Sequence, residues 1–273
     1  MKDIQVFFPS VGAVVESVTR NLTDGASKDR GYEFADCTFE GACDLGRKGW
    51  PAGAARAKKL LDKIALDPKD THSVTQYDVT GSYVDVGEYV QGTPECMVDF
   101  VTDTRTRRFL HIVVAGAYSA GVSAELAMQR GVAIAATVDA LEARGIRCSV
   151  DVVTIVGTHA AQDDRYTTTV QVKEASAPLN LDALAFAVAH PGFFRRLMFA
   201  VEEQQPAEIR QHFGFLSGSE KGIRFTRGGY GRIVPMPKYP GAYVFPVASW
   251  TDKEAWSEKA TLARIENILN DKA

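Results

Sequence analysis

Cysteine is scarce in this chain of 273 residues, which contains four. Cys37, Cys43, Cys96 and Cys148 include no C-x-x-C pair, the usual spacing of zinc ligands and redox centres. Cys148 lies in an apolar run typical of a buried strand, so a structural thiol is expected there. We therefore expect reduced cysteines and neither a metal nor another cofactor.

Long apolar runs are also missing. Every hydrophobic stretch is interrupted by a charge or a glycine well before the roughly 20 residues that cross a membrane. Met1-Lys2-Asp3 leads into a strand without the apolar core of a signal peptide. The composition, 45% hydrophobic and 24% charged, is that of an ordinary globular protein. We expect a cytoplasmic protein with no membrane partner.

Nucleotide-binding motifs are missing as well. The turn at 116–121 has glycine at both ends, but it lacks the Lys-Ser or Lys-Thr pair that completes a phosphate-binding loop. No G-x-G-x-x-G follows a strand. Nucleotide hydrolysis is therefore not expected.

What the sequence does contain is a crossover unit at residues 109–157. A β-branched run at 109–115 predicts a buried strand, apolar residues recur at helical spacing over 122–144, and 146–156 is a second β-branched run. Short connections between these elements predict a right-handed crossover between parallel strands. We expect an α/β fold, in which a mixed sheet with this central βαβ crossover is flanked by helices.

The remaining chain is expected to complete this core and add a smaller segment. The patterns predict strands at 3–8, 96–102 and 165–173, a strand and turn at 74–86, and helices at 10–22, 38–48, 54–65, 179–188, 192–203 and 252–270. We expect an α/β core domain at 1–205. A C-terminal β-rich, basic-aromatic segment and a terminal helix, capped by Thr251 or Asp252, then occupy 206–273 and pack on the core.

Several short strings resemble those of a family of uncharacterised phage and bacterial proteins. They are TFEGA at 38–42, GWPAG at 49–53, YDV at 77–79, VDVG at 84–87, PECM at 94–97, SAGVSAE at 119–125, LAF at 184–186, HPG at 190–192 and RRL at 195–197. The resemblance covers most of residues 38–200. It implies family membership and says little about activity.

The crossover unit also resembles the first crossover of von Willebrand factor A domains, which hold a divalent metal with a D-x-S-x-S loop. Ala115, Ala117 and Ser119 stand at the corresponding positions, so the aspartate that a hard cation needs is absent. Ser119 and Ser123 are expected to cap the following helix instead. The resemblance implies a degenerate core without a working metal site, used as a protein-interaction module through the surface near 116–123.

A catalytic alternative uses the same turn. The string at 117–121 differs from the nucleophile elbow G-x-S-x-G only at its first position, so Ser119 would be a nucleophile with His159 as its base and Asp163 or Asp164 as the third member. His111 is expected to be a satisfied core histidine, and His72, His190 and His212 form no ligand cluster. The preferred prediction is that the protein is not an enzyme.

One segment has no acidic residue at all. Residues 221–251 contain five basic side chains, in a chain whose net charge is −3, with aromatic residues between them and the string RGGYG at 227–231. Spaced cations that follow phosphates, and rings on which bases stack, are typical of single-stranded nucleic-acid binding. The candidate residues are Lys221, Arg224, Phe225, Arg227, Tyr230, Arg232, Lys238 and Tyr239, with Arg105, Arg107 and Arg108 as further members of the groove.

Two interpretations of this segment stay open. It is either a nucleic-acid groove or a β-hairpin whose aromatic residues pack inward and whose bases face water. In the first case the chain is similar in function to the single-stranded-DNA-binding RNA polymerase cofactors of short-tailed phages. That resemblance implies a role in phage transcription or replication in the host cytoplasm, with DNA as the expected ligand. A phage RNA polymerase or replication protein is then the expected partner, and an oligomer is compatible with it. The Arg195-Arg196 pair binds phosphate or lies on a solvated or carboxylate-paired helix face.

Overall fold

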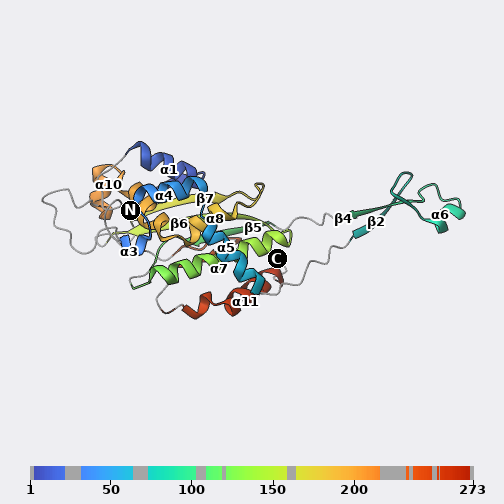
Figure 1. Ribbon diagram of the computed structural model, residues 1–273. Coiled ribbons are helices and arrows are strands. Elements are labelled where there is room, and N and C mark those ends of the chain that lie inside the picture. The colour runs from blue at the N-terminus through green and yellow to red at the C-terminus, as the bar shows by residue number, and fades with distance from the viewer. Residues whose placement is uncertain are drawn as a thin grey trace. The chain divides into compact units, whose positions relative to one another are not determined.

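Figure 1 shows the protein as a computed structural model, which describes residues 3–21, 32–63, 73–102, 109–118, 121–158, 164–215, 232–233, 236–247, 251 and 253–270. The chain forms two compact units, Met1–Ala65 with Phe109–Ala273, and Leu66–Arg108. We call them the body and the inserted unit. The domain boundary expected at residue 205 falls within the body.

The body is built on a mixed sheet, as the sequence predicts. Its strands are β1 (Asp3–Phe8), β5 (Phe109–Ala115), β6 (Arg147–Gly157), β7 (Arg165–Lys173), β8 (Arg232–Ile233) and β9 (Ala242–Phe245). They lie in the order β1-β7-β6-β5-β9, and β8 pairs with the end of β6. β5 is parallel to β6 and β9, whereas β7 is antiparallel to β6 and parallel to β1.

The central crossover runs through α7 (Ala124–Ala143), between the parallel strands β5 and β6. Ser123 begins this helix, because its hydroxyl accepts a hydrogen bond from the Leu126 amide at 3.1 Å. Gly145, with φ of +78°, follows its end, as the sequence predicts. A Cβ atom at Gly131 would overlap Ala189, so only glycine lets α7 and the next helix approach this closely.

The other helices of the body are α1 (Val11–Arg20), α3 (Tyr32–Ala35), α4 (Phe39–Lys48), α5 (Pro51–Lys63), α8 (Leu181–Ala189), a π-helix η1 (Phe193–Met198), α9 (Phe199–Glu203), α10 (Ala207–Phe213), a 3-10 helix η2 (Lys253–Trp256) and α11 (Glu258–Asn270). Figure 1 shows α4, α5, α7 and α8 together against the sheet. Ile112 and Val114 point into this helix layer, whereas Val113 lies on the opposite face, under Met236 and Tyr239. The main core therefore lies between the helices and one face of the sheet.

Two helical predictions need correction. The helix expected over 192–203 is a π-helix followed by the short α9. The terminal helix expected from residue 252 begins at Glu258, after η2. Its cap is Ser257, whose hydroxyl accepts from the Ala260 amide at 3.3 Å, rather than Thr251 or Asp252.

A buried cation joins the centre of the body to its C-terminal part. Arg130 of α7 has no exposed surface, and its Nη2 donates to the carbonyl oxygens of Ala115 at 3.1 Å and Pro246 at 2.8 Å. The guanidinium also lies over the rings of Tyr118 and Trp256. The ends of β5 and β9 and the η2 helix are thus held around one side chain.

The inserted unit, drawn in teal in Figure 1, has its own antiparallel sheet. β2 (Ser73–Asp78), β4 (Met97–Thr102) and β3 (Tyr83–Val84) lie in the order β2-β4-β3, and α6 (Val86–Val90) follows β3. The strands at 74–86 and 96–102 are therefore close to their expected positions. The sequence does not indicate that they form a unit apart from the main sheet.

No single helix among the described residues is long and apolar enough to cross a membrane. The helices at Leu181–Ala189 and Phe193–Glu203 reach that length and composition only as a pair bent by 67°.

Candidate functional site

The inserted unit has almost no core of its own. Of the side chains described between residues 75 and 99, only Val98 is buried. Val98 pairs with Tyr77 on one side and Tyr83 on the other, so these three side chains form a row across the small sheet. The two tyrosines shield Val98 and remain exposed themselves.

Exposed apolar side chains gather in this unit. Of the nine large hydrophobic side chains that are exposed in the described part of the chain, seven belong to it: Tyr77, Val79, Tyr83, Val84, Val86, Tyr89 and Val90. Val90 is the most exposed, at 78%. The other two are Phe7 and Phe109, which lie on the helix-free face of the body sheet. Large apolar side chains that are exposed together in one small unit mark an interaction site more often than singly scattered ones do.

Carboxylates hold the fold of the inserted unit. Asp85 accepts hydrogen bonds from the Tyr77 hydroxyl at 2.8 Å and from the Gly87 amide at 2.9 Å, and so caps α6. Asp99 accepts from the Ser82 amide at 2.8 Å across the sheet. The bond from Tyr77 holds the pKa of Asp85 below its usual value, and hydrogen bonds from Ser82 do the same for Asp99. Both side chains are therefore ionised at neutral pH.

No Lys or Arg lies among these acids in the described part of the unit, whereas Lys69, Arg105, Arg107 and Arg108 flank it within the same unit. Residues 73–102 contain five Asp and Glu residues and no Lys or Arg. A surface of tyrosine and valine with ionised carboxylates repels phosphate groups and anionic lipids, and it fits an apolar surface edged by Lys or Arg.

Most of the candidate nucleic-acid residues lie outside the described part of the chain. These are Lys221, Arg224, Phe225, Arg227, Tyr230, Arg105, Arg107 and Arg108. Arg232 begins β8, where it pairs with Gly157 at the end of β6. Lys238 is exposed. The predicted groove therefore lies mostly outside the described residues, and nucleic-acid binding stays a prediction.

The described rings of the C-terminal segment pack against the body. Tyr239 is partly buried on Val113, Val153 and Ile155, and this burial, with Asp151 nearby, raises the pKa of its hydroxyl. Phe245 is buried in the main core, where its ring meets Tyr243 at 5.1 Å. These rings therefore face the interior of the body, as in the second interpretation of this segment.

The Arg195-Arg196 pair is divided between the surface, where Arg195 is exposed, and the core, where Arg196 lies. Arg196 is fully buried and its Nε donates to the Cys37 carbonyl at 3.0 Å. The Arg195 guanidinium lies over the rings of Phe34 and Phe199. The expectation of a solvated or phosphate-binding pair is wrong for Arg196, because the π-helix turns this residue toward the α3 region.

The proposed catalytic group stays untested. Ser119, His159 and Asp163 lie outside the described residues. Asp164, the alternative third member, is buried and its Oδ2 lies 2.7 Å from Nε2 of His212. His212, which the sequence treats as isolated, therefore has a carboxylate partner on the neighbouring strand end.

His111 differs from its expected role in the core. Its side chain is 33% exposed on the helix-free face of the sheet, and its Nε2 lies 2.8 Å from Oδ2 of Asp151. The two residues come from adjacent parallel strands, two positions apart in register. Sequence reasoning missed this pair, although alternation along 109–115 places His111 on the same face as Val113.

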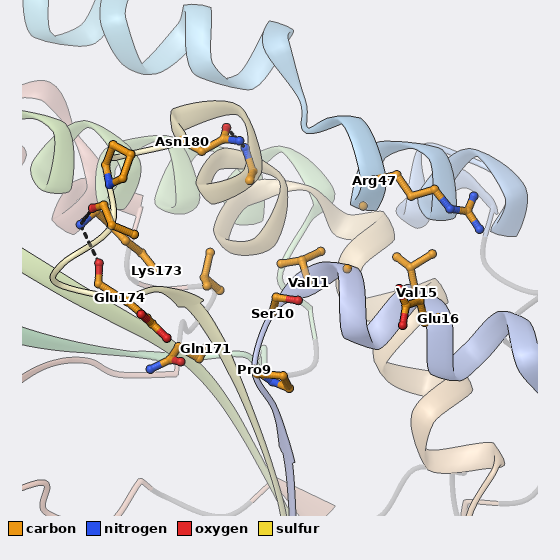
Figure 2. Close-up of a pocket in the computed structure, with 16 residues that line it drawn as sticks. Pro9, Ser10, Val11, Val15, Glu16, Arg47, Gln171, Lys173, Glu174 and Asn180 are labelled. Atoms are coloured by element: carbon orange, nitrogen blue, oxygen red, sulfur yellow. Dashed lines mark hydrogen bonds between the residues drawn. The ribbon is translucent and has the colours of Figure 1, made fainter.

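A pocket of about 570 Å³ lies between α1, α4, β7 and α8. Figure 2 shows Lys173 and Glu174 on one side of it and Arg47 and Glu16 on the other. The Lys173 ammonium is already bound by Glu142 at 2.8 Å and by backbone carbonyls, including that of Glu174 at 3.0 Å. The charge of Lys173 is thus paired within the body. The pocket lining contains two acidic side chains, Glu16 and Glu174, and two basic ones, Arg47 and Lys173.

The described residues contain no candidate set of metal ligands. No group of three or more His, Cys, Asp or Glu side chains there is arranged to hold a metal ion. Burial raises the pKa of Cys37 to about 11 and that of Cys148 to about 12, so these thiols are protonated and unreactive at neutral pH.

The fold and this surface define a mixed α/β protein with a small, acidic antiparallel unit inserted before its central crossover. The model of a domain of unknown function, DUF7192, matches residues 2–272, so the chain belongs to that family. No curated protein matches the chain. No solved structure matches it either.

Proposed function

We propose that this protein is a non-enzymatic binding protein of the cytoplasm whose inserted unit is the contact surface for a protein partner. The observation that carries the proposal is the concentration of exposed tyrosine and valine side chains in that unit. Tyrosine is enriched at protein interfaces because its ring adds contact area while its hydroxyl stays hydrated.

The way the unit is folded supports this assignment. Its turns and α6 are held by Asp85 and Asp99, so the exposed apolar groups other than Tyr77 and Tyr83, which lie beside Val98, are not needed to close a core. Their exposure carries a cost in water that burial against a partner removes, at about 25 cal/mol per Å² of apolar surface. The inserted unit therefore replaces the surface near 116–123 as the proposed contact site.

The partner chemistry follows from the charge. Residues 73–102 have five carboxylates and no Lys or Arg, while the cations of the unit lie outside this range, so the surface at 73–102 favours a partner on which apolar residues are surrounded by Lys and Arg. Part of the affinity is then electrostatic, so it decreases as salt rises.

The experiment replaces exposed side chains of the unit and follows the complex in cell extract of the source organism. The variant carries Tyr83→Ser, Tyr89→Ser and Val90→Ser, and the control carries Phe7→Ser, a change at an exposed ring of the body. We expect the parent and the control to elute in size-exclusion chromatography above the 29.7 kDa of the free chain, and the triple variant to elute at that mass. Co-elution of the triple variant with the parent would overturn the proposal.

A second candidate function is single-stranded nucleic-acid binding through residues 221–251. It is favoured by the charge of that stretch, five basic and no acidic residues. Replacing Arg224, Arg227 and Arg232 together with Ala is expected to weaken binding of a labelled oligothymidine and to reduce the slope of log affinity against log salt by about 2. An unchanged slope, or no binding by the parent at low salt, rejects this function.

A further inference from the structure

One strand of the inserted unit has a neighbouring strand on one side only. In the order β2-β4-β3, β2 is an outer strand, and all six of its residues pair with β4 in antiparallel register without a shift. Its sequence, SVTQYD, contains no Lys and no Pro, the residues that commonly protect such an edge from other strands. The side chains from Thr75 to Asp78 are exposed. β2 therefore presents an unprotected edge to which a further strand can be added.

The hydrogen bonds of the small sheet show which backbone groups of β2 face outward. The Cys96 carbonyl accepts a hydrogen bond at 2.8 Å from the amide of the residue after β3, so it faces the β3 side. Backbone groups alternate in direction along an antiparallel strand, so those of Met97 face β2, where Met97 pairs with Asp78. Asp78 thus faces β4, and Thr75 and Tyr77 face away from it. No described residue forms a hydrogen bond with these outward amide and carbonyl groups.

The side chains at this edge alternate between an aromatic and an acidic face. Tyr77 lies on one face of the small sheet, in the row that it forms with Val98 and Tyr83. Asp78 lies on the opposite face, together with Asp99, which pairs with the residue before Tyr77. A strand added beside β2 extends both rows, so its apolar residues pack beside Tyr77 and the residues between them lie beside Asp78.

The charge of the small sheet decides what those intervening residues are. Residues 73–102 contain five Asp and Glu residues and no Lys or Arg. Hydrogen bonds from Ser82 hold the pKa of Asp99 below its usual value, so this face carries negative charge at neutral pH. An acidic strand is repelled there, whereas Lys or Arg side chains gain ion pairs across the added edge.

We infer that β2 binds an extended segment of the partner protein as an additional strand, with apolar side chains on the Tyr77 face and Lys or Arg on the Asp78 face. The inference rests on the proposed function, whose partner it narrows to a segment of this pattern. Hydrogen bonds to the outward groups of Thr75 and Tyr77 supply affinity, and the alternation of side chains supplies selectivity.

The probe is a synthetic peptide, KVKYKVK, acetylated, amidated and labelled, and its binding to the full-length chain is followed by fluorescence anisotropy. The control peptide KKKKVYV has the same composition and charge without the alternation. We expect the alternating peptide to bind, to bind about tenfold more tightly than the control, and to weaken as salt rises. Failure of the alternating peptide to bind, or equal affinity for both peptides, overturns the inference.

Backbone contact is tested with two N-methylated forms of KVKYKVK, one methylated at the Val and Tyr amides and the other at the Lys amides. Only alternate amides of an added strand face β2, so one form should lose binding and the other should keep it. Binding of both forms, or of neither, contradicts strand addition.

Hydrogen exchange by NMR locates the contact on the chain. With KVKYKVK bound, the outward amides of Thr75 and Tyr77 should exchange more slowly, while that of Gln76, which already faces β4, should change little. Unchanged exchange at Thr75 and Tyr77 in the presence of bound peptide places the peptide elsewhere and overturns the inference.

Substitutions at the edge complete the test. Thr75→Pro removes one outward amide and leaves the hydrogen bonds to β4, so it should weaken peptide binding about tenfold, whereas Thr75→Ala should bind as the parent does. Asp78→Asn keeps the oxygen that accepts from the Val79 amide at 2.6 Å but removes the charge, so it should reduce both affinity and salt dependence. Parent-like binding by Thr75→Pro contradicts the inference.

The outcome can be separated from the fate of the proposed function. If the peptide does not bind but the complex in extract still depends on Tyr83, Tyr89 and Val90, strand addition is rejected and the proposed function stands. If the extract complex ignores those side chains, the proposed function is rejected and the inference falls with it.

Discussion

The body and the inserted unit are stabilised in different ways. In the body, α7 is covered by α5, α8, α11 and β6, and most of its side chains are buried. In the inserted unit, only Val98 is buried among residues 75–99, and carboxylates hold the turns. Both regions contain many apolar residues, so composition does not separate them. What separates them is whether those residues face the protein or the solvent.

This difference predicts where each region is sensitive to change. A body stabilised by buried apolar side chains is destabilised by changes in packing and by changes in the protonation of buried groups. A unit held by carboxylates is damaged by their loss and by loss of the Tyr77 hydroxyl that donates to Asp85.

The largest effect is expected from Gly131→Val. A Cβ atom at this position overlaps Ala189 and the Val188 carbonyl, so α7 and α8 must separate. We expect the free energy of unfolding of the body, measured by urea titration, to fall by about 3 kcal/mol. Gly12→Ala is the control, because its new methyl group meets only the Ser10 hydroxyl at ordinary contact distance. Equal stability of the two variants would show that the helices do not pack as described.

Acid is expected to destabilise the body through His190. Burial lowers the pKa of this side chain to about 4, from 6.5. Because the unfolded chain then binds more protons than the folded one, stability is lost as pH falls from 6.5 to 4, by roughly 3 kcal/mol. Urea titrations of the parent and of His190→Asn should show a weaker pH dependence in the variant. Parallel curves would mean that His190 does not titrate in this window.

An effect of opposite sign is expected at Glu202. Burial raises the pKa of this carboxyl well above its usual value, and Glu203 adds to the shift. The folded chain therefore holds a proton that the unfolded chain releases, and stability decreases as pH rises above 4.5. Glu202→Gln removes this dependence, so the variant should gain melting temperature relative to the parent between pH 5 and pH 8. A constant difference across that range would contradict the assignment.

The smallest and most local effect is expected from Asp85→Ala in the inserted unit. The cap on α6 is lost, so the amides of Gly87 and Glu88 should exchange hydrogen faster, while amides of α7 keep their protection. Because the pKa of Asp85 is lowered in the fold, the same amides should lose protection in the parent as pH falls below about 3.8. Uniform exchange changes in both regions would indicate that they are not separately stabilised.

Much of the body could be predicted because its signals are local. The crossover follows from two β-branched runs, a helical repeat and Gly145, and each of these acts within a few residues. The π-helix at Phe193–Met198 could not be predicted, since its apolar spacing fits an α-helix equally well. The burial of Arg196 is a consequence of that difference, because an extra residue in the turn changes which side chain faces inward.

The candidate site was much less accessible to sequence reasoning. Alternating residues at 74–86 predict a strand whether the apolar side faces a core or a partner, so exposure of Tyr77 and Tyr83 has no local signal. One signal was present, since residues 70–104 lack any Lys or Arg.

The enclosure of Arg130 has a consequence for synthesis of the chain. Its guanidinium is bound by the Pro246 carbonyl and covered by Trp256, both of which are translated more than a hundred residues after it. Until those residues leave the ribosome, this cation must remain hydrated, and α7 cannot settle fully on the sheet. Completion of the body is therefore expected to be post-translational, with the inserted unit exposed and available while the rest of the chain is still being made.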